Sequence, residues 1–484
     1  MRRLYALLTL LAAFGLVFAV PLARAAEAPG EPLETIVARL VDEALGANLE
    51  LEAAGASVAE RLAVLDQARA RYLPALDLAA RYSRADGGRK IDIPVGDLLN
   101  PVYSTLNGLT GSSRFPSIAN QQVPFLRSRE QDTHLSLTQP LYDARLPAAI
   151  AAAAADYAGA GLGRAALQGR IARDLRIGYY RWLEAHARIA ILEATLELAR
   201  ENRRVNDSLY RNGKTTRDLL YRAEADLLEV EQSRLAAGNA EQLARGYVNL
   251  LCNARLDREL PPAVVGDPAL ERLQEALARR AGAPGLALPE LQTVAVERRP
   301  ELKQLEAASA AAEAAEHLAR AAFRPQLALA VDAGTQGERY GLGSDDRYAI
   351  ASLVLKFNFY SGGADAAGVA GARAAGRAAR ANRSLAEQRI RLEVEQAYDD
   401  LKVASSSLDT AAKRVDAAAG AFRIAARKRD LGQINQAEFI DARRALTDAE
   451  LNLNLTRFEA LGSVAELEYA LGAATQRPSP ESRP

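Results

Sequence analysis

The sequence carries two copies of one long pattern, and this duplication limits the possible folds more than any other feature. The segment NLELEAAGASVAERLAVLDQARARYLPALDLAA (48–80) aligns with RPELKQLEAASAAAEAAEHLARAAFRPQLALAV (299–331), with Glu50 on Glu301 at a separation of 251. An internal repeat is usually one supersecondary unit used more than once. The chain is therefore predicted to fold as two copies of one module.

Further matches extend the duplication toward the C-terminus. LSLTQPLYDAR (135–145) aligns with LVLKFNFYSGG (353–363) at a separation of 218, so the first copy has 33 extra residues between its two matches. Asp218 then aligns with Glu438 at a separation of 220. The two copies together account for nearly all of the chain that follows its N-terminal segment.

The repeats define the expected domains. We expect a first repeat at residues 26–265, an inter-repeat linker at 266–283, a second repeat at 284–473 and a disordered tail at 474–484. Residues 1–25 are interpreted as a secretory signal peptide, because two arginines precede an apolar run that ends in Ala-Arg-Ala, a small-x-small cleavage sequence. An uncleaved N-terminal anchor is the alternative.

Within each copy the hydrophobic period changes from helical to alternating. Helical periodicity over about residues 34–72 and 289–323 ends before a proline, where the next conformation must be extended. Alternation follows and predicts two strands per copy, each apolar on one face and polar on the other. The four segments are ALDLAARYSR (75–84), HLSLTQPLY (134–142), QLALAVD (326–332) and LVLKFNF (353–359).

These strands allow two interpretations. A soluble antiparallel sheet packed on one face has the same alternation. However, strands of roughly 9 to 11 residues also match the span of a transmembrane strand, and the long segment 85–131, rich in Gly, Pro, Ser and Asn, suits a surface loop. Four strands cannot close a barrel and lipid does not tolerate an open sheet edge, so a membrane protein of this kind must pool strands between subunits.

A very long helix is predicted after the second strand of each copy, at about residues 147–211 and 364–430. At 1.5 Å per residue such helices extend roughly 95 to 100 Å, several times the hydrocarbon thickness of a bilayer. Bends at Gly213 and Gly432 then return the chain through a second helix. Each copy is therefore expected to end in a helical hairpin.

Composition excludes some classes of function. Lys plus Arg and Asp plus Glu both number 61, so net charge favours neither nucleic acid nor an anionic surface. Cys252 is the only cysteine, which excludes an internal disulfide. After the signal, no run reaches the roughly 18 apolar residues of a membrane helix. An exported chain of this kind is either soluble in the envelope or held in a membrane by strands.

These features resemble the TolC-type outer-membrane efflux protein family. The resemblance rests on ARYLPALDL at the first helix-to-strand junction, LSLTQPLYDAR at the exit of the second strand and GQINQAEFIDA at the second bend. It implies a mainly α fold with membrane β structure, in which a homotrimer closes a twelve-stranded outer-membrane β-barrel continued by a periplasmic α-helical barrel. It further implies an outer-membrane location in a Gram-negative bacterium, with contacts to outer-membrane lipid.

The resemblance also implies a function. The chain would be the outer-membrane channel of a tripartite efflux or type I secretion system, a passive conduit to which a periplasmic adaptor (membrane fusion) protein and an inner-membrane pump dock. The alternative is a soluble periplasmic coiled-coil scaffold or adaptor, which would share the signal and the helices. No enzyme activity, cofactor, metal or nucleic acid is expected, because His134, His186 and His317 lack metal-ligand spacing and no nucleophile-base arrangement is visible.

The resemblance places the functional residues at the two bends. Those expected at the hairpin tips, in contact with the adaptor, are Gly213, Lys214, Asp218, Gly432 and Gln433.

Two carboxylates follow the second bend. Glu438 and Asp441 are three residues apart and share a helix face, so a trimer would place six carboxylates around one axis, provided that face looks inward as the resemblance implies. Such a constriction would attract cations and raise the pKa values of its members. The ordinary alternative is that acidic residues stabilise the first turn of a helix through its dipole.

Two arginines near the bends complete the hypothesis. Arg217 or Arg429 is expected to pair with an acidic residue of the neighbouring hairpin and hold the resting tunnel closed. This sequence departs from the family pattern by having Glu438 where Asp is usual. The first bend, GKTTRD, is also one residue shorter than the second, so its contacts cannot be transferred residue by residue.

Overall fold

The computed structural model describes residues 31–263 and 287–473, apart from 340 and 342. The expected signal peptide, inter-repeat linker and tail lie outside the described residues. The described chain forms two compact units. Unit 1 takes its residues from Met1–Ala56, Gly161–Lys303 and Ser384–Pro484, and unit 2 takes its residues from Ser57–Ala160 and Gln304–Arg383.

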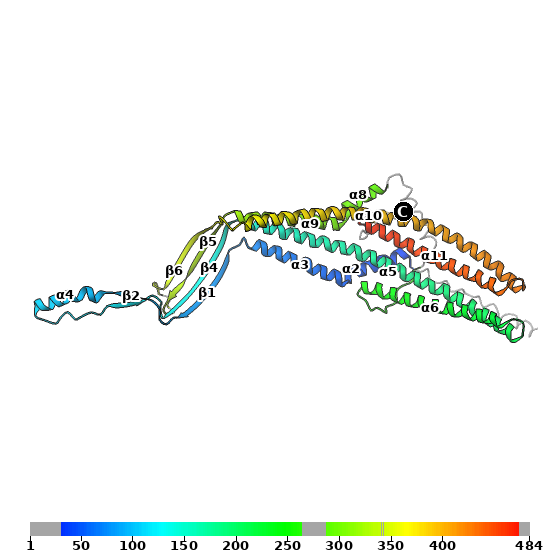
Figure 1. The fold of residues 1–484 in the computed structure, drawn as a ribbon, viewed down its shortest axis with the longest axis horizontal. Helices are drawn as coiled ribbons and strands as arrows, with labels where there is room; N and C mark the ends of the chain where they lie inside the picture. Colours follow the sequence, from blue (N-terminus) through cyan, green and yellow to red (C-terminus); the bar gives the residue numbers. More distant parts are fainter. Residues whose placement is uncertain (1–30, 264–286, 340, 342, 474–484) are drawn as a thin grey trace, which may run out of the picture. The chain divides into compact units, whose positions relative to one another are not determined.

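A four-stranded antiparallel sheet lies in unit 2 (Figure 1). Its strands, in spatial order, are β1 (Ala75–Arg84), β4 (Arg129–Asp143), β5 (Gln326–Gly337) and β6 (Arg347–Lys356). Each repeat contributes two strands, and the β4–β5 ladder joins the repeats. The prediction of two strands per copy is confirmed, with β1 and β6 at the sheet edges.

The strand register gives this sheet one apolar and one polar face, because successive side chains point to opposite sides. The apolar face combines Leu76, Leu78, Ala80, Leu135, Leu137, Leu329, Val331, Ala351 and Leu353. The polar face combines Asp77, Arg81, Asp132, His134, Ser136 and Asp332. The apolar face is uncovered in the single chain, since Leu78 is 71% and Leu355 68% exposed.

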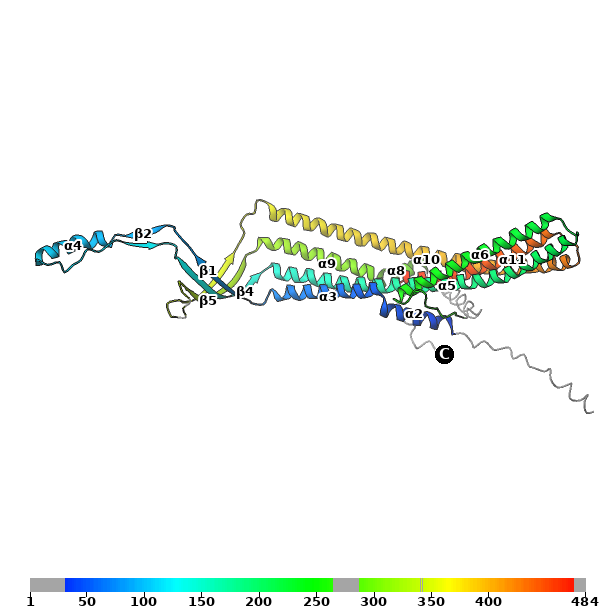
Figure 2. The ribbon, with the colours of Figure 1, turned by 90° about the horizontal axis from the view of Figure 1, so that it is seen from below.

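The segment 85–131 is folded, although its composition suggested a loop. It contains β2 (Lys90–Ile93), α4 (Val95–Thr110) and β3 (Gln121–Pro124), and the β2–β3 ribbon continues from β1 and β4 (Figures 1 and 2). Two asparagines hold α4 to the returning chain. The side-chain amide of Asn100 donates to the Ile118 carbonyl and accepts from the Ile118 N–H, both at 2.8 Å. Asn107 forms the same pair of bonds with the backbone of Phe115, at 2.8 and 3.1 Å.

Each leading helix is interrupted at an equivalent position, which corrects the expectation of two unbroken helices. The elements are α2 (Leu33–Ala47), α3 (Leu49–Ala70), α8 (Leu288–Arg298) and α9 (Pro300–Arg320), followed by a single 3₁₀ turn, η1 (Ala321–Phe323). Asn48 breaks the first helix because its Oδ1 caps α3, accepting from the amides of Glu50 and Leu51. Arg299 breaks the second because it precedes Pro300, which disfavours the helical conformation.

The predicted helical hairpins are present in both repeats (Figure 1). The outgoing helices are α5 (Arg145–Arg211) and α10 (Ala364–Asp430), of 67 residues each, and the returning helices are α6 (Arg217–Leu251) and α11 (Gln436–Ala470), of 35 residues each. A 67-residue helix extends about 100 Å. None of the helices in the described ranges combines the length and the apolar character that crossing a bilayer requires.

The core of unit 1 lies where α2, α5 and α6 meet. Tyr179 and Trp182 are buried there, and their polar atoms are satisfied: the tyrosine hydroxyl donates to the Pro261 carbonyl (2.7 Å) and the indole N–H donates to Glu241 (2.8 Å). Both aromatic side chains therefore serve helix packing. A second cluster joins α8, α10 and α11, and includes Leu291, Ala295, Ile390, Val394 and Leu467.

Cys252 is expected to be unreactive in the folded protein. Its thiol is 2% exposed, and burial raises its pKa to about 11. At pH 8 the thiolate fraction is then roughly 100-fold below that of an ordinary cysteine. An aromatic disulfide reagent should modify the native protein at least about 100-fold more slowly than the denatured protein. Equal rates in the two states would show that the thiol is accessible.

Candidate functional site at the hairpin tips

Both bends use the same C-terminal cap. Gly213 has φ +66° and Gly432 has φ +68°, in the left-handed region that glycine adopts without strain. The amides of each glycine and of the residue after it, Lys214 or Gln433, donate to carbonyls of the last helical turn over 2.8 to 2.9 Å. The structure thus places all four of these predicted residues in the turns that end α5 and α10.

The helix that leaves each bend begins differently. Asn435 caps α11: its Oδ1 accepts from the Glu438 amide and its Nδ2 donates to the Glu438 carboxylate, both at 2.9 Å. The N-cap bond satisfies one free amide of the first turn, and the bond between the two side chains holds Asn435 in place. Thr216 makes no side-chain cap bond at the start of α6, whose first turn contains Asp218. The two bends, 212–216 and 431–435, have the same length, so the expectation of a shorter first bend is wrong, and the helices differ only in that α11 has the side-chain cap.

Glu438 and Asp441 lie on the same exposed face of α11, on either side of the buried pair Phe439 and Ile440. Glu438 takes part in the cap, so the helix-stabilising role weighed from the sequence has a structural basis. Asp441 lies one turn further on and is exposed. Both carboxylates remain accessible to a cation or to a neighbouring chain.

The two arginines of the gate hypothesis lie over aromatic rings of their own chain. The Arg429 guanidinium carbon is 4.2 Å from the centroid of the Phe439 ring, and that of Arg217 is 5.2 Å from the centroid of the Tyr221 ring. Cation–π contacts of this kind hold a guanidinium without neutralising it. Arg429 thereby links the end of α10 to the start of α11.

The most buried ion pair between the two hairpins was not foreseen from the sequence. The Arg443 Nη2 of α11 lies 2.6 Å from the Asp226 Oδ1 of α6, and the two side chains are 3% and 2% exposed. Arg444 adds a second contact to the same oxygen (3.2 Å) and a further pair with Glu229 (2.6 Å). Because α6 and α11 belong to different repeats, this cluster joins the two hairpins.

A sequence signal for the pair did exist. Asp226 falls on the inward stripe of α6 with Ala223 and Val230, and Arg443 falls on that of α11 with Phe439. A charged residue at an inward position requires a partner, because an isolated buried charge is strongly unfavourable. Opposite charges at such positions on two helices of one chain could have predicted the contact.

Polar contacts continue between α5 and α11 behind the tips. The bonds join Gln436 to Asn202 (2.5 Å), Thr447 to Thr195 (3.1 Å) and Asn454 to the Glu184 backbone (2.9 Å). Burial raises the pKa of the Glu184 carboxyl beside this seam. Polar groups of this kind can form hydrogen bonds with water instead. Separating α5 from α11 here therefore exposes less apolar surface than separating two helices packed through aliphatic side chains.

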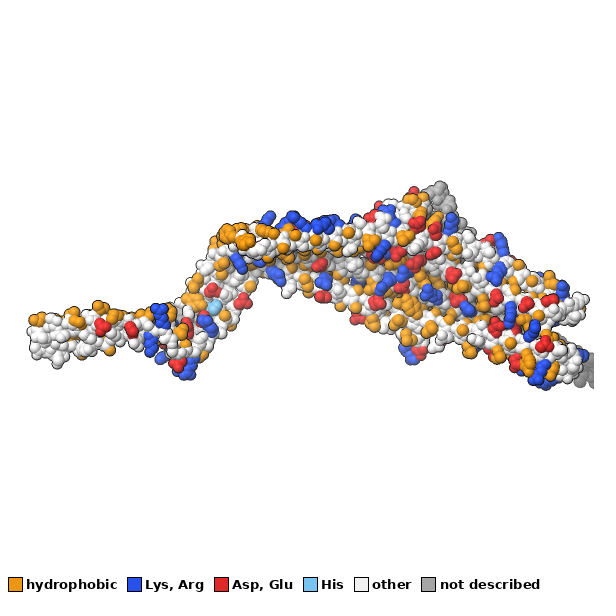
Figure 3. Space-filling model, viewed as in Figure 1, with side chains coloured by type: hydrophobic (Ala, Val, Ile, Leu, Met, Phe, Trp, Pro, Cys, Tyr) orange, Lys and Arg blue, Asp and Glu red, His pale blue; other side chains and the backbone are white. Residues whose placement is uncertain are grey.

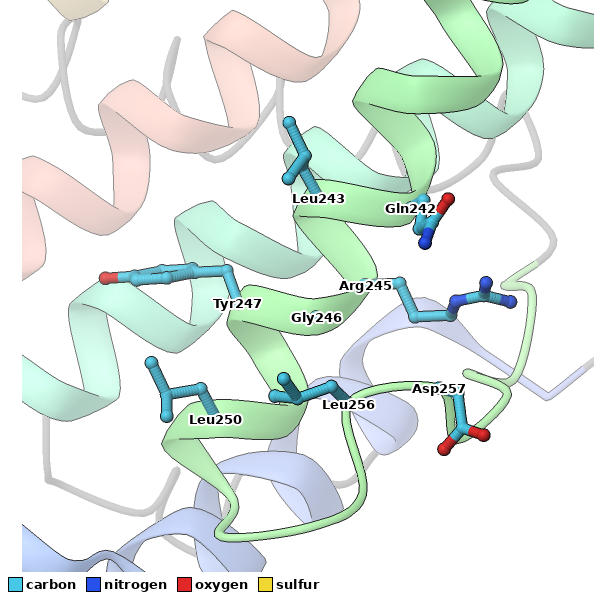
Figure 4. Close-up of a pocket in the computed structure, with 8 residues that line it drawn as sticks. All are labelled: Gln242, Leu243, Arg245, Gly246, Tyr247, Leu250, Leu256 and Asp257. Atoms are coloured by element: carbon cyan, nitrogen blue, oxygen red, sulfur yellow. The ribbon is translucent and has the colours of Figure 1, made fainter.

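A hollow of roughly 420 Å³ lies at the C-terminal end of α6, on the border of the loop that follows it. Figure 4 shows Leu243, Tyr247 and Leu250 on one side of the helix and Arg245 with Asp257 on the other. Its lining is mostly apolar, which suits packing better than catalysis. Across the described ranges, no group of three or more His, Cys, Asp or Glu residues is placed to hold a metal ion.

Comparisons with known proteins agree with this architecture. The chain is similar to three solved channels: CusC (18% identity, 92% of this chain and 93% of that chain, TM-score 0.74), Campylobacter jejuni CmeC (15%, 91% and 86%, 0.72) and Neisseria gonorrhoeae MtrE in its open state (19%, 91% and 90%, 0.71). These likenesses establish the fold. No curated protein matches the sequence significantly.

The family assignment comes from the sequence profile of the outer membrane efflux proteins. This profile matches residues 40–246 and 291–473, which cover most of both repeats. The match confirms the resemblance and favours the channel over the soluble scaffold. The chain belongs to the outer membrane efflux protein family.

Proposed function

We propose that three copies of this chain assemble into a passive conduit across the outer membrane and the periplasm. The observation that supports this most strongly is the sheet of unit 2, which has an uncovered apolar face and two free edges, β1 and β6. In lipid, an open edge leaves backbone groups without hydrogen bonds, so the edges must pair between copies. Twelve strands spaced 4.8 Å apart and tilted about 40° close a barrel of about 24 Å backbone diameter.

Exposed apolar stripes on the hairpins support assembly of the helices as well. On α6, Tyr221, Leu228 and Leu235 recur every seven residues and are exposed. Ile424 on α10 and Leu431, the residue directly after that helix, have the same spacing and are exposed. A seven-residue apolar repeat is typical of helices that pack side by side. The stripes therefore suit contacts between hairpins of neighbouring copies, which would close a helical barrel.

The hairpin tips are the proposed docking point for a periplasmic adaptor, which connects the conduit to an inner-membrane pump. Gly213, Lys214, Gly432 and Gln433 are exposed at the turns, and Asp218 is exposed at the start of α6. Both turns present backbone and polar side chains, and the second turn adds the exposed Leu431. A contact of this kind suits a partner that binds reversibly.

The gate hypothesis makes a separate prediction for conductance. In the trimer, Glu438 and Asp441 would line the constriction, and Arg217 or Arg429 would leave its ring contact to pair with an acid of the next hairpin. Arg429→Ala is expected to raise resting single-channel conductance severalfold, and Glu438→Ala with Asp441→Ala is expected to lower cation selectivity severalfold. Single-channel recording checks both results. If all of these variants behave like the wild type, the constriction lies elsewhere.

Fractionation separates the conduit from a soluble scaffold. The mature protein should sediment with the outer membrane and run as an oligomer on gels unless it is heated. A strand-paired barrel resists detergent at room temperature, because every backbone group within it is bonded. Recovery of the protein wholly in the soluble periplasmic fraction would overturn the proposal.

A further inference from the structure

The charged residues on the apolar face of the sheet are confined to one end. The register places Arg84 directly opposite Arg129 on the side that carries the exposed leucines. Arg347 is on the same side, opposite Thr335, in the row of Ala80, which is four residues nearer the leucines than the row of Arg84. The carboxylates of these strands, including Asp77, Asp132 and Asp332, lie on the other face. The strands thus place three cations and no carboxylate at this end of the apolar face, and the carboxylate of Asp346, from the β5–β6 turn, lies against Gly337 there.

These three arginines have no carboxylate partner in the described ranges. Each is exposed, and none of them forms an ion pair or a side-chain hydrogen bond there. By contrast, Arg81, on the polar face of the same strand, lies 3.7 Å from Asp132. Like charges directly opposite on neighbouring strands are destabilising. Two facing arginines are therefore unfavourable unless an external anion lies between them.

The order of side chains along β1 matches the depth profile of a membrane leaflet. On the apolar side the strand runs from Leu76 and Leu78 through Ala80 to Tyr82, and ends at Arg84. The eight residue-to-residue steps from Leu76 to Arg84 span about 26 Å along the strand. Tyrosine is enriched where hydrocarbon meets headgroups, and a cation one row further on lies at headgroup depth.

The arginine rim is at the end of the sheet away from the helices. Arg84 and Arg129 lie at the exit to the β2–β3 ribbon, and Arg347 begins β6 after the β5–β6 turn. Figure 3 shows Lys and Arg side chains gathered where the strands end and the ribbon begins. If the helices occupy the periplasm, this end reaches the outer leaflet.

We infer that Arg84, Arg129 and Arg347 form a binding site for the phosphate groups of the outer-leaflet lipid. The planar guanidinium group binds phosphate through two parallel hydrogen bonds, and the leucines below it contact the acyl chains. The inference rests on the proposed function, because it requires the apolar face to lie in the outer membrane. It assigns a specific ligand class to that face, beyond general contact with lipid.

The test measures lipid binding to the purified full-length oligomer in detergent. Two probes are compared in mixed micelles: bis-phosphorylated lipid A and the same lipid without phosphates. In a third measurement, inorganic phosphate at matched concentration is added as a competitor. Arg84→Gln, Arg129→Gln and Arg347→Gln are combined, and Arg81→Gln on the polar face is the matched control. Each rim arginine contributes roughly fivefold in affinity, so the triple variant should bind the phosphorylated lipid about 100-fold more weakly. The control should stay within about twofold of the wild type.

Three results would overturn the inference. One is a triple variant that binds as the wild type does, and another is a wild type that binds both lipids equally. The third is competition by inorganic phosphate at matched concentration, which would mark an adventitious ion only. If the triple variant does not assemble, Arg347→Gln alone decides, with an expected loss of about fivefold. A gel of heated and unheated wild-type sample tests separately whether the oligomer forms. Failure of the proposed function is therefore distinguishable from failure of lipid binding.

Discussion

Arg443→Met should loosen both hairpin tips by about 3 to 4 kcal/mol, because it leaves the buried Asp226 with only the half-exposed Arg444 as a counter-charge. In the wild type, the Asp226 side chain is 2% exposed, and its Oδ1 lies 2.6 Å from the Arg443 Nη2. Hydrogen exchange of the amides in α6 and α11 measures the effect directly. Their protection should fall by a factor of about 10² to 10³, whereas the amides of α2 should keep theirs.

Two further variants control for the loss of packing. Asp226→Leu combined with Arg443→Met removes both charges, and its protection should return close to the wild-type value or exceed it. Arg444→Met removes a half-exposed partner of the same aspartate and should cost less than about 1 kcal/mol. If the amides of α6 and α11 in Arg443→Met keep their protection within about threefold of the wild type, the buried pair does not join the hairpins.

Leu78→Arg should prevent stable insertion of the protein in the outer membrane. Leu78 lies on the apolar side of the edge strand β1 and is 71% exposed. An arginine facing lipid near the bilayer centre costs about 2 to 4 kcal/mol, and the proposed trimer would incur this cost three times. The fraction of protein in heat-modifiable oligomer from purified outer membranes should drop at least tenfold.

The neighbouring residue on the same strand supplies the matched control. Ala79 is paired with His134 on the polar face, so Ala79→Arg introduces the same charge one position along but directs it away from lipid. Its oligomer yield should stay within about twofold of the wild type. If Ala79→Arg fails and Leu78→Arg inserts normally, the lipid-facing side of the sheet has been assigned wrongly.

Much of the fold could be predicted because its signals are local. Gly213 and Gly432 mark the bends, since only a left-handed residue ends a helix in this way. The alternation of apolar and polar residues predicted the strands and which side chains share a face. The breaks at Asn48 and Arg299 also had local signals, a capping residue and a following proline, but continuous helical periodicity on both sides concealed them.

Other features depend on pairings distant in sequence. The helix α4 is held by Asn100 and Asn107 against chain that returns eight or more residues later, so composition alone suggested a loop. Likewise, the Asp226–Arg443 pair requires the register of α6 against α11, residues 217 positions apart. Local motifs located the tips, but only the packed helices showed what joins them.

Single-channel recording tests the conduit most directly. The purified wild-type oligomer, added to a planar lipid bilayer, should give discrete and long-lived current steps, and the same preparation dissociated by heat should give none. The steps should be of uniform size, because every oligomer would have the same barrel and the same constriction at its hairpin tips. A properly folded oligomer that enters the bilayer but passes no current at any voltage would contradict the proposed conduit.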